Sequence, residues 1–385
     1  MITIKLPSQV SYIISTLENN NHHAFAVGGC IRDSLMNKIP EDWDICTSAT
    51  PEQIIKTFRS HSVLKTGIKH GTVTLILDDN SHFEITTFRN DGTYTDSRRP
   101  DSVEFVTDIK EDLSRRDFTI NAIGYNRQGI VDFFDGIEDI NRKTIKCVGE
   151  ADKRFQEDAL RILRALRFSS VLGFEIEKDT SKAIINNKHL LRNIAVERIM
   201  IEFTKTLLGD NVDSVINKYF DIFCEFLIPD GISMFFNHLN ISKYPKDINI
   251  RLSYLFLETS IHPSILKDLK FDNKTIKTVS ELVEYHNKKL LPDKANIKQW
   301  LNKIGEERLK QHLFLKPDEN ISGLLDEIII NKECYSIKML AITGDDLKNS
   351  GIVQGVEIGN RLNYLLDKVI NGEVPNNKMD LITCP

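Results

Sequence analysis

Two aspartates with a single residue between them, Asp42 and Asp44 in "DWDI", are the first residues whose spacing suggests chemistry. Alternate side chains of a strand leave the same face, so we expect both carboxylates to lie side by side. Neighbouring carboxylates repel each other unless a cation or a proton lies between them. Oxygen ligands of this kind suit Mg²⁺ completed by substrate phosphates. Glu84 in "HFEITTF" is the candidate third carboxylate, on a neighbouring strand. Because D-x-D is short, a surface strand with two exposed aspartates is the alternative.

A glycine pair precedes these carboxylates. In "VGGCIRD", Gly28 and Gly29 end a predicted strand and open a helix that carries Arg32. Glycine allows close approach of the backbone to a ligand, and the free N–H groups of a helix N-terminus attract phosphate. The segment is neither a Walker A loop nor G-x-G-x-x-G, and a tight turn is its plain alternative. Together with D-x-D, however, it predicts a triphosphate site beside a metal site.

A third candidate is the segment "RFQEDALRILRALRF", residues 154–168. It has the apolar spacing of an amphipathic helix, and its Arg161, Arg164 and Arg167 recur at every third position. Asp158 precedes Arg161 by three residues, which places the two side chains next to each other on one helical face. A surface ion pair is the ordinary explanation of such spacing.

The elements that must position these residues change in character along the chain. Up to about residue 145, short β-rich runs alternate with brief helical patterns; the runs are "AFAV", "DWDICT", "TVTLIL", "FEITTF" and "VEFV". After the second run, Thr50, Pro51 and Gln53 have the spacing of a capping box. From Ala151 on, the patterns are helical almost throughout, with a seam near Pro292. The sequence predicts an α/β head with a mixed sheet, followed by all-α domains.

Composition places the chain among globular proteins of several domains. Its 385 residues are 41% hydrophobic and 27% charged, and we find no apolar run long enough for a membrane span. No signal peptide pattern is present, and the six cysteines lie far apart without a C-x-x-C pair, as expected of a cytoplasmic protein. Net charge is −5, yet residues 141–205 hold 14 Lys and Arg against 9 Asp and Glu. This basic segment indicates a phosphate-bearing ligand, with a solvated helical face as the alternative.

The order of the motifs resembles a known family. "VGGCIRDSLMNKIPEDWDI", "FEITTFR", "RRDFTINA", "DGIEDI", "EDALRILRALRF" and "VERIMIEF" follow each other as in the class II, bacterial-type CCA-adding tRNA nucleotidyltransferases. These enzymes belong to the tRNA nucleotidyltransferase/poly(A) polymerase family, within the DNA polymerase beta-like superfamily. The resemblance is dense over about the first 205 residues, and "GVEIGNRLNYLLDKVINGEVPNN" resembles the tail of the same enzymes. It implies a catalytic head (1–145), a neck (146–208), a body (209–291) and a tail (292–385).

The resemblance also implies roles. Asp42 and Asp44 would hold two Mg²⁺ ions, and Glu84 would help deprotonate the 3′-hydroxyl of the RNA. Residues that would bind the phosphates and sugar of CTP or ATP are Gly28, Gly29, Arg32, Arg116, Asp117 and Asn121. The last three, from "RRDFTINA", are spaced to lie on one side of a helix. A helix start capped by Asp117 is the alternative for this motif.

The third candidate then has a functional interpretation. Cytosine and adenine each present an amino donor beside a ring nitrogen acceptor, whereas uracil and guanine present the reverse pattern. A carboxylate only accepts hydrogen bonds and a guanidinium only donates them, so Asp158 with Arg161 could select C and A without a template. The wrong bases would leave buried polar groups unpaired, which is costly. Arg164 and Arg167 would contact phosphate or base.

Residues 89–105 resemble the flexible loop of full CCA-adding enzymes, with an ordinary long loop as the alternative. The implied partners are CTP, ATP and tRNA, whose acceptor end and elbow would contact the body and tail through shape and backbone charge. A homodimer is compatible with the resemblance. The nearer alternatives are a poly(A) polymerase or an A-only-adding enzyme. A noncatalytic RNA-binding protein is the remote one, disfavoured by the presence of Asp42, Asp44 and Glu84.

Overall fold

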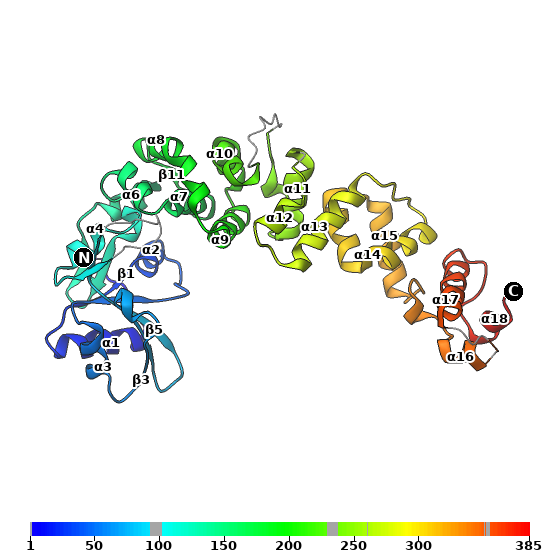
Figure 1. Ribbon diagram of the computed structural model, residues 1–385, viewed down its shortest axis with the longest axis horizontal. Coiled ribbons are helices and arrows are strands. Elements are labelled where there is room, and N and C mark those ends of the chain that lie inside the picture. The colour runs from blue at the N-terminus through cyan, green and yellow to red at the C-terminus, as the bar shows by residue number, and fades with distance from the viewer. Residues whose placement is uncertain (1, 93–101, 229–237, 260, 350, 352–354) are drawn as a thin grey trace. The chain divides into compact units, whose positions relative to one another are not determined.

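The computed structural model describes residues 2–92, 102–228, 238–259, 261–349, 351 and 355–385 (Figure 1). The chain forms two compact units. The first comprises Met1–Ser233 with His238–Ser242, and the second comprises Met234–Asn237 with Lys243–Pro385. The first unit joins a mixed α/β head to helices, and the described part of the second is helical, as predicted. The finer division into head, neck, body and tail stays a prediction.

Seven strands form one mixed sheet in the described head, in the order β3-β4-β5-β2-β1-β8-β9. Only β2 and β5 run parallel among these neighbours, and the other pairs are antiparallel. The strands are β1 (Ala24–Val27), β2 (Asp44–Thr47), β3 (Ser62–Leu64), β4 (Thr72–Ile76), β5 (His82–Thr87), β8 (Ile123–Asn126) and β9 (Gly129–Asp132). Four of the five β-rich runs of the sequence lie in this sheet, whose strand β2 begins at Asp44 of the D-x-D motif, whereas "VEFV" lies outside it.

Helices cover both faces of this sheet, and β1 is therefore buried along its whole length. On one face lie α1 (Ser8–Asn19) and α3 (Pro51–Thr57), which pack against each other (Figure 1). On the other face, Phe25 and Val27 pack against two buried residues of α4 (Ile109–Ser114). The capping box predicted at the start of α3 is confirmed, since the Thr50 side chain accepts a hydrogen bond from the backbone of Gln53.

Two short pairings lie outside the main sheet. β6 (Arg89–Asp91) and β7 (Val103–Phe105) form an antiparallel ribbon at the ends of the predicted loop. The centre of that loop, residues 93–101, lies outside the described residues. A parallel pair, β10 (Thr144–Ile145) with β11 (Glu175–Ile176), places one strand inside a region that the sequence predicted to be helical.

The helices of the first unit that follow the head are α6 (Ala151–Glu157), α7 (Leu160–Leu172), α8 (Lys178–Asn187), α9 (Val196–Leu207) and α10 (Val212–Leu227). The prediction of one continuous helix over residues 154–168 is wrong. Asp158 is extended (φ −141°, ψ 100°), and its side-chain oxygen accepts a hydrogen bond from the backbone N–H of Leu160 at 3.1 Å. Aspartate favours such local bonds over helix interiors, so it separates α6 from α7.

The second unit contains α11 (Ile248–Thr259), α12 (Ile265–Asp268), α13 (Asn273–His286), α14 (Lys294–Leu315), α15 (Glu319–Ile330), α16 (Gly344–Asn349), α17 (Gly355–Ile370) and α18 (Lys378–Thr383). The helical pattern is interrupted at Pro292 as predicted, since this residue lies between α13 and α14, whereas a domain boundary at this point stays a prediction. One apolar cluster surrounds Trp300, and another joins α17 to the C-terminal residues. Among the helices described here, none has both the length and the apolar character needed to cross a membrane.

Candidate active site

Strand pairing brings the predicted carboxylates together. β2 and β5 run parallel with Ile45 opposite Ile85, and both isoleucines are buried. The residues one position earlier, Asp44 and Glu84, therefore lie on the other face of the sheet as neighbours on adjacent strands. β2 begins at Asp44, so the prediction that Asp42 lies within the strand is wrong. Asp42 lies two residues before the start of the strand and still lines the same cavity as Asp44 and Glu84.

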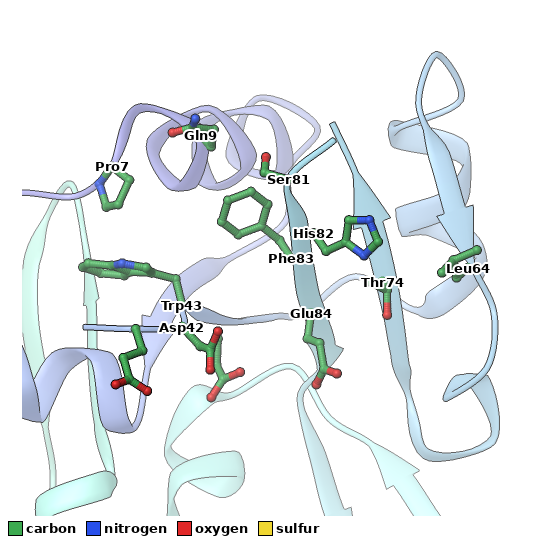
Figure 2. Close-up of a pocket in the computed structure, with 12 residues that line it drawn as sticks. Pro7, Gln9, Asp42, Trp43, Leu64, Thr74, Ser81, His82, Phe83 and Glu84 are labelled. Atoms are coloured by element: carbon green, nitrogen blue, oxygen red, sulfur yellow. The ribbon is translucent and has the colours of Figure 1, made fainter. Parts of the chain in front are cut away.

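This cavity, of about 810 Å³, opens around the start of β2 and is the larger of two cavities that Asp42 and Asp44 line. Figure 2 shows Glu84 and Asp42 projecting to one side, whereas Trp43 and Phe83 project to the other. Its lining residues are Pro7, Gln9, Glu41, Asp42, Trp43, Asp44, Leu64, Thr74, Ser81, His82, Phe83 and Glu84. No lysine or arginine is among these described residues, so the cavity is strongly acidic.

The three carboxylates are left without partners by the described part of the chain. Asp42, Asp44 and Glu84 are exposed, and none makes a side-chain hydrogen bond or ion pair there. Desolvation, and then repulsion from Asp42, raise the pKa of Asp44 against the attraction of Arg116. Unpaired, mutually repelling carboxylates fit divalent cations. Among the described residues, no three His, Cys, Asp or Glu side chains are placed so that they could hold a metal ion by themselves. The remaining ligands would therefore come from substrate and water.

A smaller cavity of about 450 Å³ shares Asp42 and Asp44 with the larger one. Its lining residues are Gly29, Cys30, Arg32, Asp33, Lys38, Ile39, Glu41, Asp42, Asp44, Val171 and Leu172. Burial raises the pKa of the Cys30 thiol to about 12 and keeps it protonated, so thiolate chemistry is excluded at this position. The D-x-D motif thus forms the boundary between two cavities.

The glycine pair has the predicted place at the start of α2 (Gly29–Leu35). Gly28 has a φ of +80°, a backbone conformation that favours glycine, and a Cβ there would crowd Nη1 of Arg116 at 3.0 Å. Arg32 is buried in α2, where it donates to the side-chain oxygen of Asn121 at 2.7 Å and to that of Asp33 at 2.9 Å. Its guanidinium lies 5.2 Å from the ring centroid of Phe168 on α7, so its orientation is fixed.

The prediction that Arg116, Asp117 and Asn121 share one side of a helix is wrong. α4 ends before Arg116, and Phe118 is extended (φ −130°, ψ 148°) and fully buried. Burial of this aromatic ring draws the chain out of helical geometry, and Asn121 ends a separate 3₁₀ turn. The residues are nevertheless brought together, since Asn121 Nδ2 donates to Asp117 Oδ1 at 3.2 Å.

Asp117 is joined to the arginines of α7. Both Nε and Nη2 of Arg164 donate to its Oδ2, at 2.8 and 2.6 Å. Burial alone would raise the pKa of Asp117, but the charge and hydrogen bonds of Arg164 outweigh it and lower the pKa to about 2. Arg167 donates to Oε2 of Glu202 on α9 at 2.5 Å and lies 4.0 Å from the Phe168 ring centroid. These arginines are therefore held in place by carboxylates and an aromatic ring.

The expected pairing of Asp158 with Arg161 on one helical face is also wrong. Asp158 accepts hydrogen bonds from Nη2 and Nη1 of Arg198 on α9, at 2.9 and 3.3 Å. Arg161 donates to Glu157 Oε2 at 2.7 Å and to the backbone carbonyl oxygen of Arg115 at 3.0 Å. The break between α6 and α7 gives each of the two residues its own partner.

Four partners in this network were not singled out from the sequence. They are Asp112, Glu157, Arg198 and Glu202. Asp112 is fully buried between Arg115 and Arg116. A signal existed for Arg198 and Glu202, because opposite charges four residues apart share one face of a helix. Only the tertiary pairing of α9 with α7 shows what that face contacts.

The head has a mixed sheet, and at the start of one strand lie carboxylates that have no partner among the described residues. A glycine turn lies beside them, and arginine-rich helices lie behind. These features define a nucleotidyltransferase with a polymerase-type head. The model of the Poly A polymerase head domain matches residues 24–146. The probable RNA and SrmB-binding site of polymerase A matches 173–221, and the putative tRNA nucleotidyltransferase domain 2 matches 251–384.

Curated relatives and solved structures agree with these matches. The CCA-adding enzyme of Leuconostoc mesenteroides is 38% identical over 381 residues, which cover 95% of this chain and 92% of the relative. The crystal structure of the Bacillus stearothermophilus CCA-adding enzyme in complex with CTP is 30% identical, with a TM-score of 0.81 over 98% of this chain and 96% of that one. The Thermotoga maritima CCA-adding enzyme, complexed with tRNA, shares the fold at 21% identity and a TM-score of 0.70, over 97% and 93% of the two chains. The chain belongs to the CCA-adding enzyme family.

Proposed function

We propose that the protein adds and repairs the 3′-terminal CCA of tRNA from CTP and ATP without a nucleic-acid template, releasing pyrophosphate. The observation that supports it best is the set of three carboxylates, Asp42, Asp44 and Glu84, around one cavity and without partners among the described residues. Family membership supports it as well, since similar proteins are a CCA-adding enzyme with bound CTP and one with bound tRNA. The six cysteines, none of them in a disulfide, suit action in the cytoplasm.

Asp42 and Asp44 would hold two Mg²⁺ ions, as their unpaired and mutually repelling carboxylates suggest. Such ions supply positive charge that activates the attacking 3′-hydroxyl and stabilises the leaving phosphate oxygens. Glu84, from the neighbouring strand, would accept the proton of that hydroxyl. The hydroxyl oxygen then attacks the α-phosphorus in line, and the bond from the α-phosphorus to the bridging oxygen breaks as pyrophosphate leaves.

The residues around α7 would hold the sugar and base. Asp117 and Asn121, fixed by Arg164 and Arg32, would receive the ribose and its 2′-hydroxyl. Arg161 makes three hydrogen bonds to Glu157, Arg154 and Arg115, so two of its five N–H groups remain for a base. Asp158 Oδ2, which accepts one hydrogen bond, likewise keeps acceptor capacity for the amino group of C or A, whereas Oδ1 already accepts two. Gly28, Gly29 and Arg32 would border the phosphates. Beyond residue 209, the helices would contact the acceptor stem and elbow of tRNA.

The deciding experiment supplies tRNA that ends before CCA with each nucleotide alone and then with CTP and ATP together. We expect two C residues from CTP, an A only after both C residues, and no product from UTP or GTP. Incorporation of A alone, or of long A tracts, would favour the A-only enzyme or the poly(A) polymerase, which the head-domain match also admits. Binding of tRNA without any incorporation would support a noncatalytic RNA-binding protein.

A further inference from the structure

The two cavities that meet at Asp42 and Asp44 differ in charge. The described lining of the larger cavity contains four carboxylates, from Glu41, Asp42, Asp44 and Glu84, and neither lysine nor arginine. The smaller cavity also contains four carboxylates, from Asp33, Glu41, Asp42 and Asp44, but it adds the cations Arg32 and Lys38, so it is the less acidic of the two. A neutral group would enter the first more readily, whereas an anion would be attracted to the cationic side of the second.

The two cations of the smaller cavity, Arg32 and Lys38, differ in whether they already have hydrogen-bond partners among the described residues. The Arg32 guanidinium is buried and already committed to Asp33 and Asn121. Lys38 is exposed, and within the described chain its ammonium makes neither a hydrogen bond nor an ion pair. Its three N–H donors are therefore available to a ligand.

The backbone that carries Lys38 is well fixed. Asn37 has a φ of +57°, and the backbone N–H of Lys38 donates to the carbonyl oxygen of Asp33 at 2.8 Å, a left-handed turn that ends α2. The same helix begins at the glycine pair. The position of this lysine relative to the D-x-D motif is thus set by α2 rather than by a free loop.

The chemistry of nucleotidyl transfer gives this asymmetry a direction. The attacking hydroxyl oxygen and the leaving oxygen lie on opposite sides of the α-phosphorus in an in-line displacement. The attacking hydroxyl is neutral before it loses its proton, whereas the leaving pyrophosphate carries several negative charges. With Asp42 and Asp44 between two cavities, the more acidic one suits the hydroxyl. The one that adds Lys38, whose ammonium has no partner among the described residues, suits the pyrophosphate.

We infer that Lys38, in the smaller cavity, binds the β- and γ-phosphates of the incoming nucleotide. It then retains the pyrophosphate in this cavity until the product leaves. This inference rests on the proposed function. Lys38 was not among the residues that the motifs of the sequence singled out. It would act on the leaving group alone, so it should affect every nucleotide equally and contribute nothing to base selection.

The test measures inhibition of CTP and ATP incorporation by inorganic pyrophosphate and, in parallel, competition by CMP, using the full-length protein. For Lys38→Ala and Lys38→Gln, loss of one charge-assisted hydrogen bond should weaken pyrophosphate inhibition about tenfold. CMP competition should stay unchanged. Lys38→Arg should retain most of the inhibition. The matched control is Lys56→Ala, which removes an equally exposed lysine that lines neither cavity.

Three outcomes would overturn the inference. They are unchanged pyrophosphate inhibition in Lys38→Ala, an equal loss in Lys56→Ala, and an equal weakening of CMP competition. Because Lys38 has no partner in the described fold, thermal unfolding of the variant should match that of the parent protein. If the parent protein incorporates no nucleotide into tRNA, the proposed function itself fails. That result differs from a parent enzyme that is active and has a Lys38 variant with normal pyrophosphate inhibition.

Discussion

The carboxylates of the larger cavity and those around α7 are organised in opposite ways. Asp42, Asp44 and Glu84 are exposed and have no partner among the described side chains. Asp117 and Asp158, in contrast, each accept two hydrogen bonds from an arginine. In a site that receives cations, the carboxylates repel one another until a bound cation relieves this repulsion. A site that receives a neutral base must instead hold its own charges in fixed positions before the base arrives.

We expect the largest effect, on the rate of nucleotide addition, at the carboxylates that have no partner among the described side chains. Asp42→Ala or Asp44→Asn should lower the rate of nucleotide addition by at least about 10³-fold, because ligands of the activating ions are lost. tRNA binding should persist in both variants. The melting temperature without divalent ions should rise for Asp44→Asn, since desolvation, with repulsion from Asp42, outweighs the attraction of Arg116, raises the pKa of Asp44 and disfavours its charged carboxylate.

Activity assays and thermal unfolding of the same preparations check both parts. Asp78→Asn is a suitable control, because this exposed carboxylate lines neither of the two cavities that carry the D-x-D motif. Normal turnover in Asp42→Ala would remove that residue from the metal site. A lower melting temperature for Asp44→Asn would contradict the description of the carboxylates as a site of unrelieved repulsion.

The paired side should respond with the opposite sign in stability. Arg164→Ala leaves the buried Asp117 carboxylate without its main partner, which should cost roughly 2–3 kcal/mol of unfolding free energy, given that Arg164 is partly exposed. Urea unfolding measures this loss. Arg142→Ala is the control, since this exposed arginine pairs with the exposed Glu138 one helical turn away and its removal should cost little. Equal stability of the two variants would show that the Asp117–Arg164 pair is not worth more than a surface pair.

The same pair predicts a dependence on pH. The pKa of Asp117 is about 2 in the folded protein, below its ordinary value of about 3.9, so the unfolded chain binds a proton more readily. The stabilisation, about 2–3 kcal/mol, is therefore complete above about pH 4 and is lost as the pH falls toward 2. The difference in unfolding free energy between the parent protein and Asp117→Asn should be constant from pH 7 to 5. It should shrink below pH 4; a constant difference down to pH 3 would contradict the assignment.

Local sequence rules predicted one side of the comparison better than the other. Strand β1, the glycine turn and the capping box at Thr50 depend on neighbours in sequence, and the structure has them where they were expected. Period-two alternation was enough to bring Asp44 and Glu84 together once β2 and β5 paired. The carboxylates of this cavity need no partner, so no distant residue had to be known to anticipate them.

The network around α7 could not be predicted in the same way. Asp158 breaks the helix through a bond to its own neighbourhood, and Phe118 leaves helical geometry because its ring is buried by distant residues. Helical periodicity therefore assigned wrong partners to Arg161 and to Arg116. Ion pairs such as Asp158 with Arg198 depend on how α7 and α9 pack, which spacing along the chain does not determine.

A double-variant experiment tests whether Arg198 on α9 acts through Asp158, the proposed base-reading carboxylate. Arg198 fixes both oxygens of Asp158, so Arg198→Ala should loosen discrimination against UTP and GTP about tenfold while addition of C and A continues. Asp158→Ala should impair C and A addition directly and lose discrimination to a greater extent. If Arg198 acts only through Asp158, the double variant should select nucleotides no worse than Asp158→Ala alone. Additive losses would mean that Arg198 contacts the nucleotide or the RNA itself, and unchanged selection in Asp158→Ala would remove the protein-template interpretation of this helix pair. Since Arg198 is a positioning residue in this account, Arg198→Lys should restore part of the selectivity by keeping one charged donor near Asp158.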